Sequence, residues 1–254
     1  MRIVVKVGGR VQADPALATS LASMWSSGER ICVVHGGGDE VSELQRQLGI
    51  DPLFVGGRRV TTRQDLALVR MALSGSANKR LVAMFSAAGI LAAGISGEDG
   101  ELIMAEPIDE ATFGRAGKPV AVNTAILDTL FDAGFLPVVS PLGTQASSRD
   151  RHGLNINGDD AAAAIAAALR AELWLISDVA GVLDDDRNLL SELDPGAVES
   201  LVAAGTVNHG MQAKLEAGFA ALEAGCPLVR VGSLAALSDR SAGTSLFLNR
   251  ALHD

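Results

Sequence analysis

The chain has 254 residues, 48% of them hydrophobic and 20% charged, and a formal net charge of −9 at pH 7. These values are typical of a globular protein and give no general electrostatic footprint for nucleic acid or for an anionic membrane. No apolar run approaches the roughly 20 residues that a membrane span needs, and a strand-like segment begins directly after Met1 and Arg2. We therefore expect a cytoplasmic protein with no nucleic-acid or membrane partner.

Short apolar runs alternate with helical patterns along the chain. Strands are predicted at residues 3–7, 31–35, 136–140, 173–177 and 228–231, and helices at 16–27, 40–48, 126–133, 160–169 and about 211–224. Because the strands are continuously apolar, the alternation predicts an α/β fold, a three-layer αβα sandwich with a mainly parallel central sheet. Ligands of such sheets bind beyond the carboxyl ends of the strands.

Residues 89–120 follow a different pattern, because turns divide them into short pieces, most clearly at residues 96–100. This pattern predicts hairpins outside the main sheet that form a flap over a substrate. The chain has no linker rich in proline or serine, so two lobes would have to meet closely. We place their boundary near residues 169–170, which gives an N-terminal lobe of residues 1–170 and a C-terminal lobe of residues 171–254.

The two cysteines, Cys32 and Cys226, lie far apart in apolar stretches. They lack the paired spacing of a zinc site or a redox motif. We expect both to be reduced core residues, and we expect no metal site built from protein ligands.

Glycine clusters follow the first two predicted strands, at Gly8 and Gly9 and at residues 36–38, and each precedes a helical pattern. Backbone N–H groups at such a turn can bind an anion, because glycine permits close approach and the start of a helix leaves donors unpaired. Either cluster alone is equally compatible with a tight turn that binds nothing. Two clusters at equivalent strand ends favour phosphate or carboxylate binding, although neither is a Walker A loop or a GxGxxG motif.

Lysine is rare in this chain, with four lysines against seventeen arginines. Lys6 ends the first apolar strand, where an unpaired charge would be costly to bury. Lys214 lies in the last predicted helix, and Asp159 lies at the start of the alanine-rich helix, where it could simply be an N-cap. An ammonium group is a compact charge that suits phosphate oxygens. These residues together predict phosphoryl transfer.

The order of the motifs resembles that of the amino-acid kinase superfamily, and within it the N-acetylglutamate kinase family, over nearly the whole chain. The motifs are VKVGG at residues 5–9, HGGG at 35–38, GRRVT at 57–61, NK at 78–79, NINGD at 155–159, SDVAGV at 177–182, and GM at 210–211 followed by Lys214. The resemblance implies the amino-acid kinase fold and the ATP-dependent phosphorylation of the side-chain carboxylate of N-acetyl-L-glutamate to N-acetyl-L-glutamyl 5-phosphate, a step of arginine biosynthesis. A carboxylate acceptor needs alignment and charge compensation rather than a general base.

The resemblance also implies roles for individual residues. Lys6 and Lys214 would contact the β- and γ-phosphates of ATP, and Asp159 would hold both ammonium groups. Mg²⁺ would bridge the phosphates and depend little on protein ligands. The implied contacts to phosphate and nucleotide come from Gly8, Gly9, Ser177, Asp178, Val179, Gly181, Val182 and Met211, and those to the acyl-amino acid from Gly37, Gly38, Arg59 and Asn155.

Some assignments have a close alternative. Arg58 is a rival of Arg59, although alignment with the family's Gly-Leu-Arg-Val-Thr favours Arg59. Asp178 is equally compatible with a turn at a strand end, Lys79 is expected to be structural, and Lys118 is expected to be a solvated loop charge. Selectivity for the acyl group is expected to depend on residues 95–101.

The main functional alternative is the related kinase that phosphorylates aminoadipate or glutamate bound to a carrier protein. The Arg-Val-Thr run favours free N-acetylglutamate, and the acidic balance gives little support for a basic surface facing an acidic carrier. A regulatory protein without turnover would be expected to lack Lys6, Asp159 or Lys214. Because arginine-inhibited members carry an extra N-terminal helix and this sequence starts at the first strand, we expect a homodimer without arginine feedback.

Overall fold

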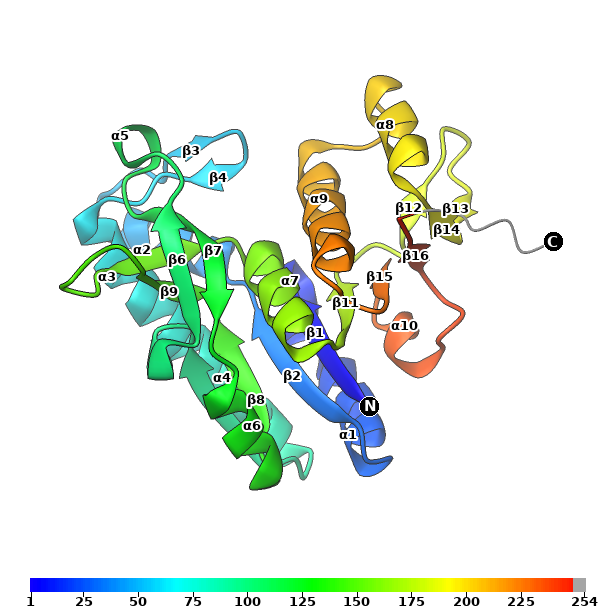
Figure 1. The fold of residues 1–254 in the computed structure, drawn as a ribbon, viewed down its shortest axis with the longest axis horizontal. Coiled ribbons are helices and arrows are strands. Elements are labelled where there is room, and N and C mark those ends of the chain that lie inside the picture. The colour runs from blue at the N-terminus through cyan, green and yellow to red at the C-terminus, as the bar shows by residue number, and fades with distance from the viewer. Residues whose placement is uncertain (249–254) are drawn as a thin grey trace.

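The computed structural model describes residues 1–248, with side chains for all of these except Arg10 and His209. Its centre is an eight-stranded sheet whose strand order is β14-β16-β15-β11-β1-β2-β8-β5 (Figure 1). Its strands are β1 (Arg2–Val7), β2 (Arg30–His35), β5 (Ala92–Ser96), β8 (Leu136–Ser140), β11 (Glu172–Ile176), β14 (Glu192–Leu193), β15 (Val229–Gly232) and β16 (Thr244–Leu246). Every pair in this sheet is parallel except β15 with β16.

Helices cover both faces of the sheet. The α-helices are α1 (Pro15–Ser26), α2 (Gly38–Gln47), α3 (Arg63–Arg70), α4 (Asn78–Ala87), α5 (Glu110–Phe113), α6 (Ala125–Asp132), α7 (Gly158–Leu169), α8 (Pro195–Ala203), α9 (His209–Glu223) and α10 (Ala235–Ser238). A π-helical segment, Met71–Ala77, joins α3 to α4, and short 3-10 turns occur at Gly9–Ala13 and Asp99–Glu101. The predicted three-layer sandwich is confirmed.

Alternation along β1 separates two cores. Val4 packs into a cluster with residues of α6, α7 and α9, whereas Ile3, Val5 and Val7 pack into a second cluster with residues of α1, α4 and α10. Successive side chains of a strand point to opposite faces. Lys6 therefore shares a face with Val4 and is directed toward the layer that contains α7, which lies over β1 and β2 (Figure 1).

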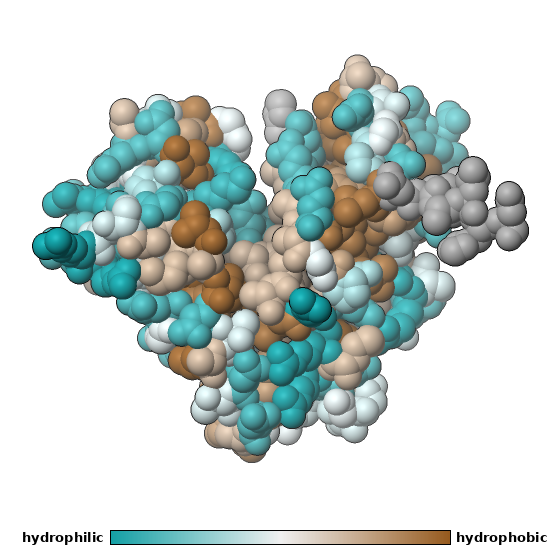
Figure 2. All heavy atoms as spheres, viewed as in Figure 1, coloured by the Kyte–Doolittle hydropathy of each residue, from teal (hydrophilic) through white to brown (hydrophobic). Residues whose placement is uncertain are grey.

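A second small sheet closes on itself beside the main sheet. It consists of β6 (Ile103–Pro107), β7 (Ala116–Val122), β9 (Leu142–Gln145) and β10 (Gly153–Ile156). Two short hairpins complete the fold, β3 (Phe54–Val55) with β4 (Arg58–Arg59) and β12 (Val182–Leu183) with β13 (Leu189–Leu190). Figure 2 shows a notch in the surface between the part that carries α5, β3 and β4 and the part that carries α8 and α9.

The prediction that residues 89–120 leave the main sheet is only partly correct. The segment Ala92–Ser96 is an edge strand of that sheet, and the chain leaves it at β6. Alanine and glycine dominate β5, so it lacks the β-branched pattern by which the other strands were recognised. Packing requires glycine at position 94, because a Cβ there would lie 1.9 Å from Asn78 Oδ1. Lys118 is exposed as expected, but it lies in β7 rather than in a loop.

The predicted lobe boundary falls where α7 ends, at Arg170, whose backbone is left-handed with φ 49° and ψ 43°. The main sheet continues across this point because β11 pairs with β1. The functional division into residues 1–170 and 171–254 remains a prediction, and its last six residues lie outside the described part of the chain. Among the described helices, none has both the length and the apolar character needed to cross a bilayer.

Candidate active site

Lys6, Asp159 and Lys214 meet at the carboxyl end of β1. Lys6 Nζ lies 3.0 Å from Asp159 Oδ1, and Lys214 Nζ lies 3.2 Å from the same oxygen. Lys6 comes from β1, Asp159 from the first turn of α7 and Lys214 from α9, so the contacts join segments far apart in sequence. All three residues are buried, with exposed fractions of 9%, 8% and 7%.

The N-cap alternative for Asp159 is wrong. Asn157 is the N-cap of α7, and its side-chain oxygen accepts hydrogen bonds from the backbone N–H groups of Asp159 and Asp160. Because the cap position is filled two residues earlier, the Asp159 carboxylate is free to turn inward to the two lysines.

Electrostatics and burial act differently on Asp159 and on Lys214. Burial by itself would raise the pKa of Asp159, but the positive charges of Lys6 and Lys214 more than offset it and keep that pKa below its usual value. Burial lowers the pKa of Lys214, and the charge of Lys6 lowers it further, while Asp159 acts in the opposite direction. The two ammonium groups therefore repel each other across one shared carboxylate oxygen, and an additional anion would relieve this repulsion.

Two glycines make room for the Lys6 side chain. A Cβ at position 8 would lie 2.9 Å from Lys6 Nζ, and a Cβ at position 158 would lie 3.3 Å from Lys6 Cε. Gly8 has an extended backbone, with φ −111° and ψ 159°, which any residue can adopt. Glycine is therefore needed at position 8 for space around the amine rather than for an unusual turn.

Two cavities adjoin this cluster, and both are lined by Gly36, Gly37 and Gly38. The first, of about 350 Å³, is lined in addition by Lys6, Gly8, Gly9, Gln12, Asp39 and Glu40. The second, of about 210 Å³, is lined in addition by Val41, Phe54, Gly57, Arg58, Arg59, Val69, Leu73, Ile108, Ala116, Gly117, Pro141, Asn155, Ile156, Asn157 and Gly158. The glycine loop thus lies between a space with an ammonium group and a space with a guanidinium group.

Arg59 is held rigidly at the wall of the second cavity. Its Nη2 donates to Gly38 O and to Ser42 Oγ, each at 2.7 Å, and its Nη1 donates to Gln45 Oε1. The guanidinium also lies over the Phe54 ring, with Cζ 4.6 Å from the centroid. Three of the five donors of a guanidinium are used here, which leaves two for a ligand.

Arg58 and Asn155 line the same cavity but have different partners. Arg58 forms an ion pair with Asp160 at 2.9 Å, next to the catalytic candidate Asp159. Asn155 Nδ2 donates to Thr61 Oγ1 at 3.0 Å. Residues 95–101 do not appear in the described wall, which instead takes Ile108, Ala116 and Gly117 from further along the chain.

The expected nucleotide-contacting residues lie beyond the ends of β11 and β15. Ser177 and Asp178 line a further cavity of about 300 Å³ together with Val11, Asp14, Ser233 and Leu234. The negative charge of Asp178 also acts on Lys214. Exposed Val179 follows directly after Asp178.

Gly181, Val182 and Met211 are more constrained. A Cβ at position 181 would lie 2.6 Å from Leu189 Cδ1, and Val182 is a core residue whose N–H donates to Thr244 Oγ1 at 2.8 Å. Met211 lies in the first turn of α9, where its N–H donates to the N-cap Asn208. Any contact of Val182 with a nucleotide would have to use groups other than its side chain and its N–H.

Sequence reasoning missed the residues that position Arg59. Gln45 lies between Arg59 and Asp65, because its Nε2 donates to Asp65 Oδ1 at 2.7 Å while its Oε1 accepts from Arg59. Asp65 also completes the capping box of α3 with Thr62. The one available signal was the polar character of Ser42 and Gln45 on the buried face of α2.

Comparisons with known proteins agree with this geometry. An acetylglutamate kinase of Geobacillus thermodenitrificans is 42% identical over 234 residues, which cover 91% of this chain and 89% of that protein. An acetylglutamate kinase of Paracoccus denitrificans is 42% identical over 228 residues, which cover 88% of this chain and 74% of that protein. The structure of smu.665 from Streptococcus mutans matches with a TM-score of 0.86 at 25% identity, over 98% of this chain and 99% of that one.

The family model of the amino acid kinases matches residues 1–233, a range that contains all three members of the charged cluster and both glycine turns. The chain belongs to the amino acid kinase family.

Proposed function

We propose that this protein uses ATP to phosphorylate the side-chain carboxylate of N-acetyl-L-glutamate, giving N-acetyl-L-glutamyl 5-phosphate in arginine biosynthesis. The observation that carries the proposal is the meeting of Lys6 and Lys214 at one oxygen of Asp159, beside two cavities that share a glycine loop. Relatives that are 42% identical over most of this chain are acetylglutamate kinases.

The chemistry suits this arrangement. The acceptor carboxylate is ionised at neutral pH, so the protein has to align two anions and compensate their charge. Lys6 and Lys214 would stabilise the negative charge that spreads over the transferred phosphoryl group, while Asp159 keeps both amines in place between turnovers. Gly8 and Gly9 would donate backbone N–H groups to the phosphates.

The two cavities suggest how the reactants are divided. The cavity with Lys6, Gly8 and Gly9 would take the end of the phosphate chain, and the cavity with Arg59 and Asn155 would take the acyl-amino acid. The free donors of Arg59 would bind the α-carboxylate, and Gly37 and Gly38 would face the reacting groups. Ser177, Asp178, Val179, Gly181, Val182 and Met211 would surround the rest of the nucleotide.

Mg²⁺ enters this proposal as an ion held mainly by the phosphates of ATP. Within residues 1–248, no group of three or more histidine, cysteine, aspartate or glutamate side chains is arranged to hold a metal ion. A small dication that retains phosphate and water ligands needs few protein ligands. It would neutralise part of the charge on the β- and γ-phosphates.

We further propose that residues 1–170 bind the acyl-amino acid and form a homodimer, and that residues 171–254 bind the nucleotide. In support of a dimer, β5 is the terminal strand of the main sheet, and Leu91, just before it, is 64% exposed. A second copy is one way to cover such an edge. Light scattering tests this proposal, and a monomeric mass at micromolar concentration would refute it. We also propose a cytoplasmic location, where ATP is available to the enzyme.

The decisive experiment traps the acyl phosphate. The folded protein is incubated with ATP, Mg²⁺, hydroxylamine and N-acetyl-L-glutamate, and the hydroxamate is measured against a reaction without acceptor. Parallel reactions contain N-succinyl-glutamate or carrier-linked glutamate and aminoadipate. We expect hydroxamate with the free acetylated substrate. Its absence there, together with product from a carrier-linked acceptor, would identify the carrier-dependent kinase instead.

A further inference from the structure

The glycine loop of residues 36–38 is the segment whose position matters to both reactants. It lines the cavity that contains Lys6 and the cavity that contains Arg59. Glycine has no side chain with which to fix such a loop, and Gly37 has a φ of 145° that other residues rarely adopt. The loop must therefore be held by its neighbours.

Leu73, in the π-helical segment, supports one side of the loop. A Cβ at position 37 would lie 2.5 Å from Leu73 Cδ2, so the leucine occupies the space that any larger residue would need. π-helical turns are uncommon and are often found at functional sites. This contact limits the movement of Gly37 toward the helix, but it does not determine the direction of the peptide groups.

His35 makes a polar contact to the loop. It is the last residue of β2 and is completely buried, and its Nδ1 lies 2.6 Å from Gly36 O. Its Nε2 lies 3.2 Å from Nδ2 of Asn78, which is also completely buried. Both ring nitrogens therefore have a polar partner.

The partners of Asn78 determine which ring nitrogen carries the proton. Asn78 Nδ2 donates to the carbonyl oxygen of Val138 at 2.8 Å, and Asn78 Oδ1 accepts from Lys79 Nζ at 3.0 Å. A carbonyl oxygen can only accept and an ammonium can only donate, so the amide has one possible orientation. The same Nδ2 also lies 3.3 Å from Ile95 O, so its two hydrogens are shared among two carbonyls and His35 Nε2. Nε2 of His35 thus faces a group that cannot accept, whereas Nδ1 faces the Gly36 carbonyl, which can only accept, so the proton lies on Nδ1.

The surroundings keep this ring uncharged near neutral pH. Burial lowers the pKa of His35 to about 4, against the opposing effects of the bond to Gly36 and the charge of Glu40, and the charges of Arg80 and Lys79 lower it further. Protonating Nε2 would place an N–H group opposite the Asn78 amide donor. One tautomer is therefore strongly preferred.

We propose that His35 is a positioning residue whose Nδ1–H holds the Gly36 carbonyl and thereby orients the Gly37 N–H for the phosphoryl group in flight. In a trans peptide the C=O and the following N–H point in opposite directions. Fixing Gly36 O toward the imidazole therefore directs the N–H of Gly37 away from the imidazole, and Gly37 lines both cavities. Asn78 and Lys79 act behind His35, through the tautomer. This inference rests on the proposed kinase function.

Nuclear magnetic resonance tests the tautomer without any turnover. Long-range ¹H–¹⁵N spectra of the imidazole should show His35 protonated on Nδ1 alone. The spectra should not change between pH 6 and pH 8, because this range lies well above the lowered pKa of His35, about 4. Asn78→Asp should allow a second proton on Nε2 in the same range. A wild-type ring protonated on Nε2 alone, or titrating near ~6.5, would overturn the proposal.

Kinetics test whether the bond to Gly36 matters. His35→Asn keeps an N–H donor near the position of Nδ1, whereas His35→Leu removes it. We expect His35→Leu to lower kcat by roughly 10- to 100-fold with a smaller change in KM, because small misplacements of reacting groups have effects of this size. His35→Asn should restore most of the loss.

Cys32→Ala, a truncation of a completely buried residue in the same strand, controls for lost stability. It should lower the melting temperature while leaving kcat intact. Equal kcat values for His35→Leu and the wild type would refute the positioning role, and so would an equal loss of kcat in His35→Asn and His35→Leu. If His35→Leu does not fold, the proposal is tested by the resonance measurement of the His35 tautomer in the wild type. An inactive wild type would count against the proposed function, but not against the hydrogen bond seen by resonance.

Discussion

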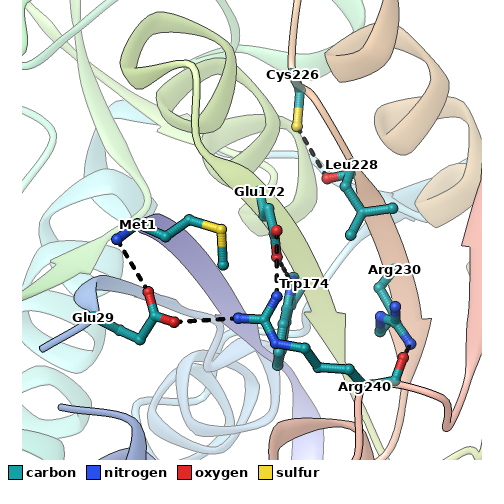
Figure 3. Close-up of polar contacts among 8 residues, drawn as sticks. All are labelled: Met1, Glu29, Glu172, Trp174, Cys226, Leu228, Arg230 and Arg240. Carbon is teal, nitrogen blue, oxygen red and sulfur yellow. Dashed lines mark hydrogen bonds and ion pairs between the residues drawn. The ribbon is translucent and has the colours of Figure 1, made fainter. Parts of the chain in front are cut away.

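Two clusters of charged side chains lie at opposite ends of the main sheet, and they use their hydrogen bonds differently. The first consists of Lys6, Asp159 and Lys214 at the carboxyl ends of the strands. The second, at the amino ends, consists of Met1, Glu29, Glu172, Arg230 and Arg240 around Trp174 (Figure 3). The first is buried, whereas in the second only Glu172 and Arg230 of the charged residues are buried and Met1 and Arg240 are exposed. Both contain ionised groups that are costly to bury.

In the amino-end cluster each carboxylate oxygen lies near a different positive or polar group. Glu29 Oε2 lies 3.3 Å from the N-terminal amine as an ion pair, and Glu29 Oε1 accepts from Arg240 at 3.3 Å. Glu172 accepts from Trp174 Nε1 on Oε2, at 2.9 Å, and from Arg240 on Oε1, at 3.4 Å. Arg230 donates to the backbone carbonyls of Arg240 and Ala242, although its Nε is buried without a hydrogen-bond partner among the described residues. The contacts of these described residues are distributed over several oxygens, and no two of their cations share one.

The carboxyl-end cluster is arranged in the opposite way. Two ammonium groups, each with three donors, converge on a single oxygen of Asp159. Donors are therefore in excess, and Lys6 lines a cavity together with five glycines, Gln12, Asp39 and Glu40. The comparison teaches that a cluster of charges does not by itself mark a site. The distinguishing property is an unequal number of donors and acceptors, which an incoming phosphate would correct.

The largest expected effect comes from removing the acceptor in each cluster. Asp159→Asn leaves two buried ammonium groups without a carboxylate and should lower the free energy of unfolding by about 3–5 kcal/mol. Glu172→Gln leaves a neutral acceptor for Trp174 and Arg240 and should lower it by about 1–3 kcal/mol. Urea unfolding measures both values.

Nucleotide distinguishes the two variants further. A polyanion can take the place of the lost carboxylate only where donors are in excess, so ADP should raise the melting temperature of Asp159→Asn by more than that of Glu172→Gln. An equal rise in both would mean that the carboxyl-end cluster has no special affinity for phosphate.

The next largest expected difference between the two clusters is in kcat. Lys6→Met keeps the unbranched side chain up to the ε position but removes the ammonium group, and it should lower kcat by ~100-fold or more with a modest change in KM, because the contact strengthens as charge develops. Arg240→Met is the matched control, with lower thermal stability and unchanged kcat. Steady-state kinetics at saturating substrates gives both numbers. A Lys6→Met enzyme with wild-type kcat would remove Lys6 from the proposed catalytic set.

The sequence predicted one of these clusters and not the other, for a physical reason. Lys6 interrupts an apolar strand beside glycines, and this local conflict indicated a buried partner before the fold was known. Arg230 also lies in a predicted strand, and Glu172 directly precedes one, but both contact Arg240, which lies in a loop that no local pattern connects to them.

The same limit applies to the supports of the site. The positions of five strands of the main sheet and the three-layer sandwich followed from apolar runs, whereas the strand order did not. Gln45 and Asn78 act through contacts between segments 14 to 60 residues apart, which single-residue preferences do not encode. The edge strand β5 was missed because its small residues serve the approach of Asn78 rather than strand propensity.

A smaller effect is expected in the pH dependence of the free energy of unfolding, to which Asp159 of the carboxyl-end cluster contributes. The pKa of Asp159 is lower in the folded protein than its ordinary value of 3.8. Between these two values the unfolded chain binds more protons than the native protein, so the contribution of Asp159 is present above this range and is lost as the pH falls through it. Other carboxylates, such as Asp65, titrate in the same direction.

The contribution of Asp159 is therefore the difference between two curves of unfolding free energy against pH, for the wild type and for Asp159→Asn. The two curves should converge as the pH falls below the lowered pKa that Asp159 has in the folded protein, because the carboxyl is then protonated in both states. Parallel curves over the whole range would show that the charge of Asp159 does not stabilise the fold.

The smallest expected effect concerns the space around the Lys6 amine. Gly8 has a backbone that alanine can adopt, so the conflict in Gly8→Ala is the 2.9 Å approach of the new Cβ to Lys6 Nζ. The end of a flexible side chain can shift by a few tenths of an ångström, so we expect a loss of kcat well below ~100-fold with stability nearly unchanged. Gly196→Ala, in α8, is the control, because the nearest atom to its Cβ is 3.6 Å away. If Gly8→Ala lowered the melting temperature but not kcat, the glycine would serve the packing of β1 and not the placement of the amine.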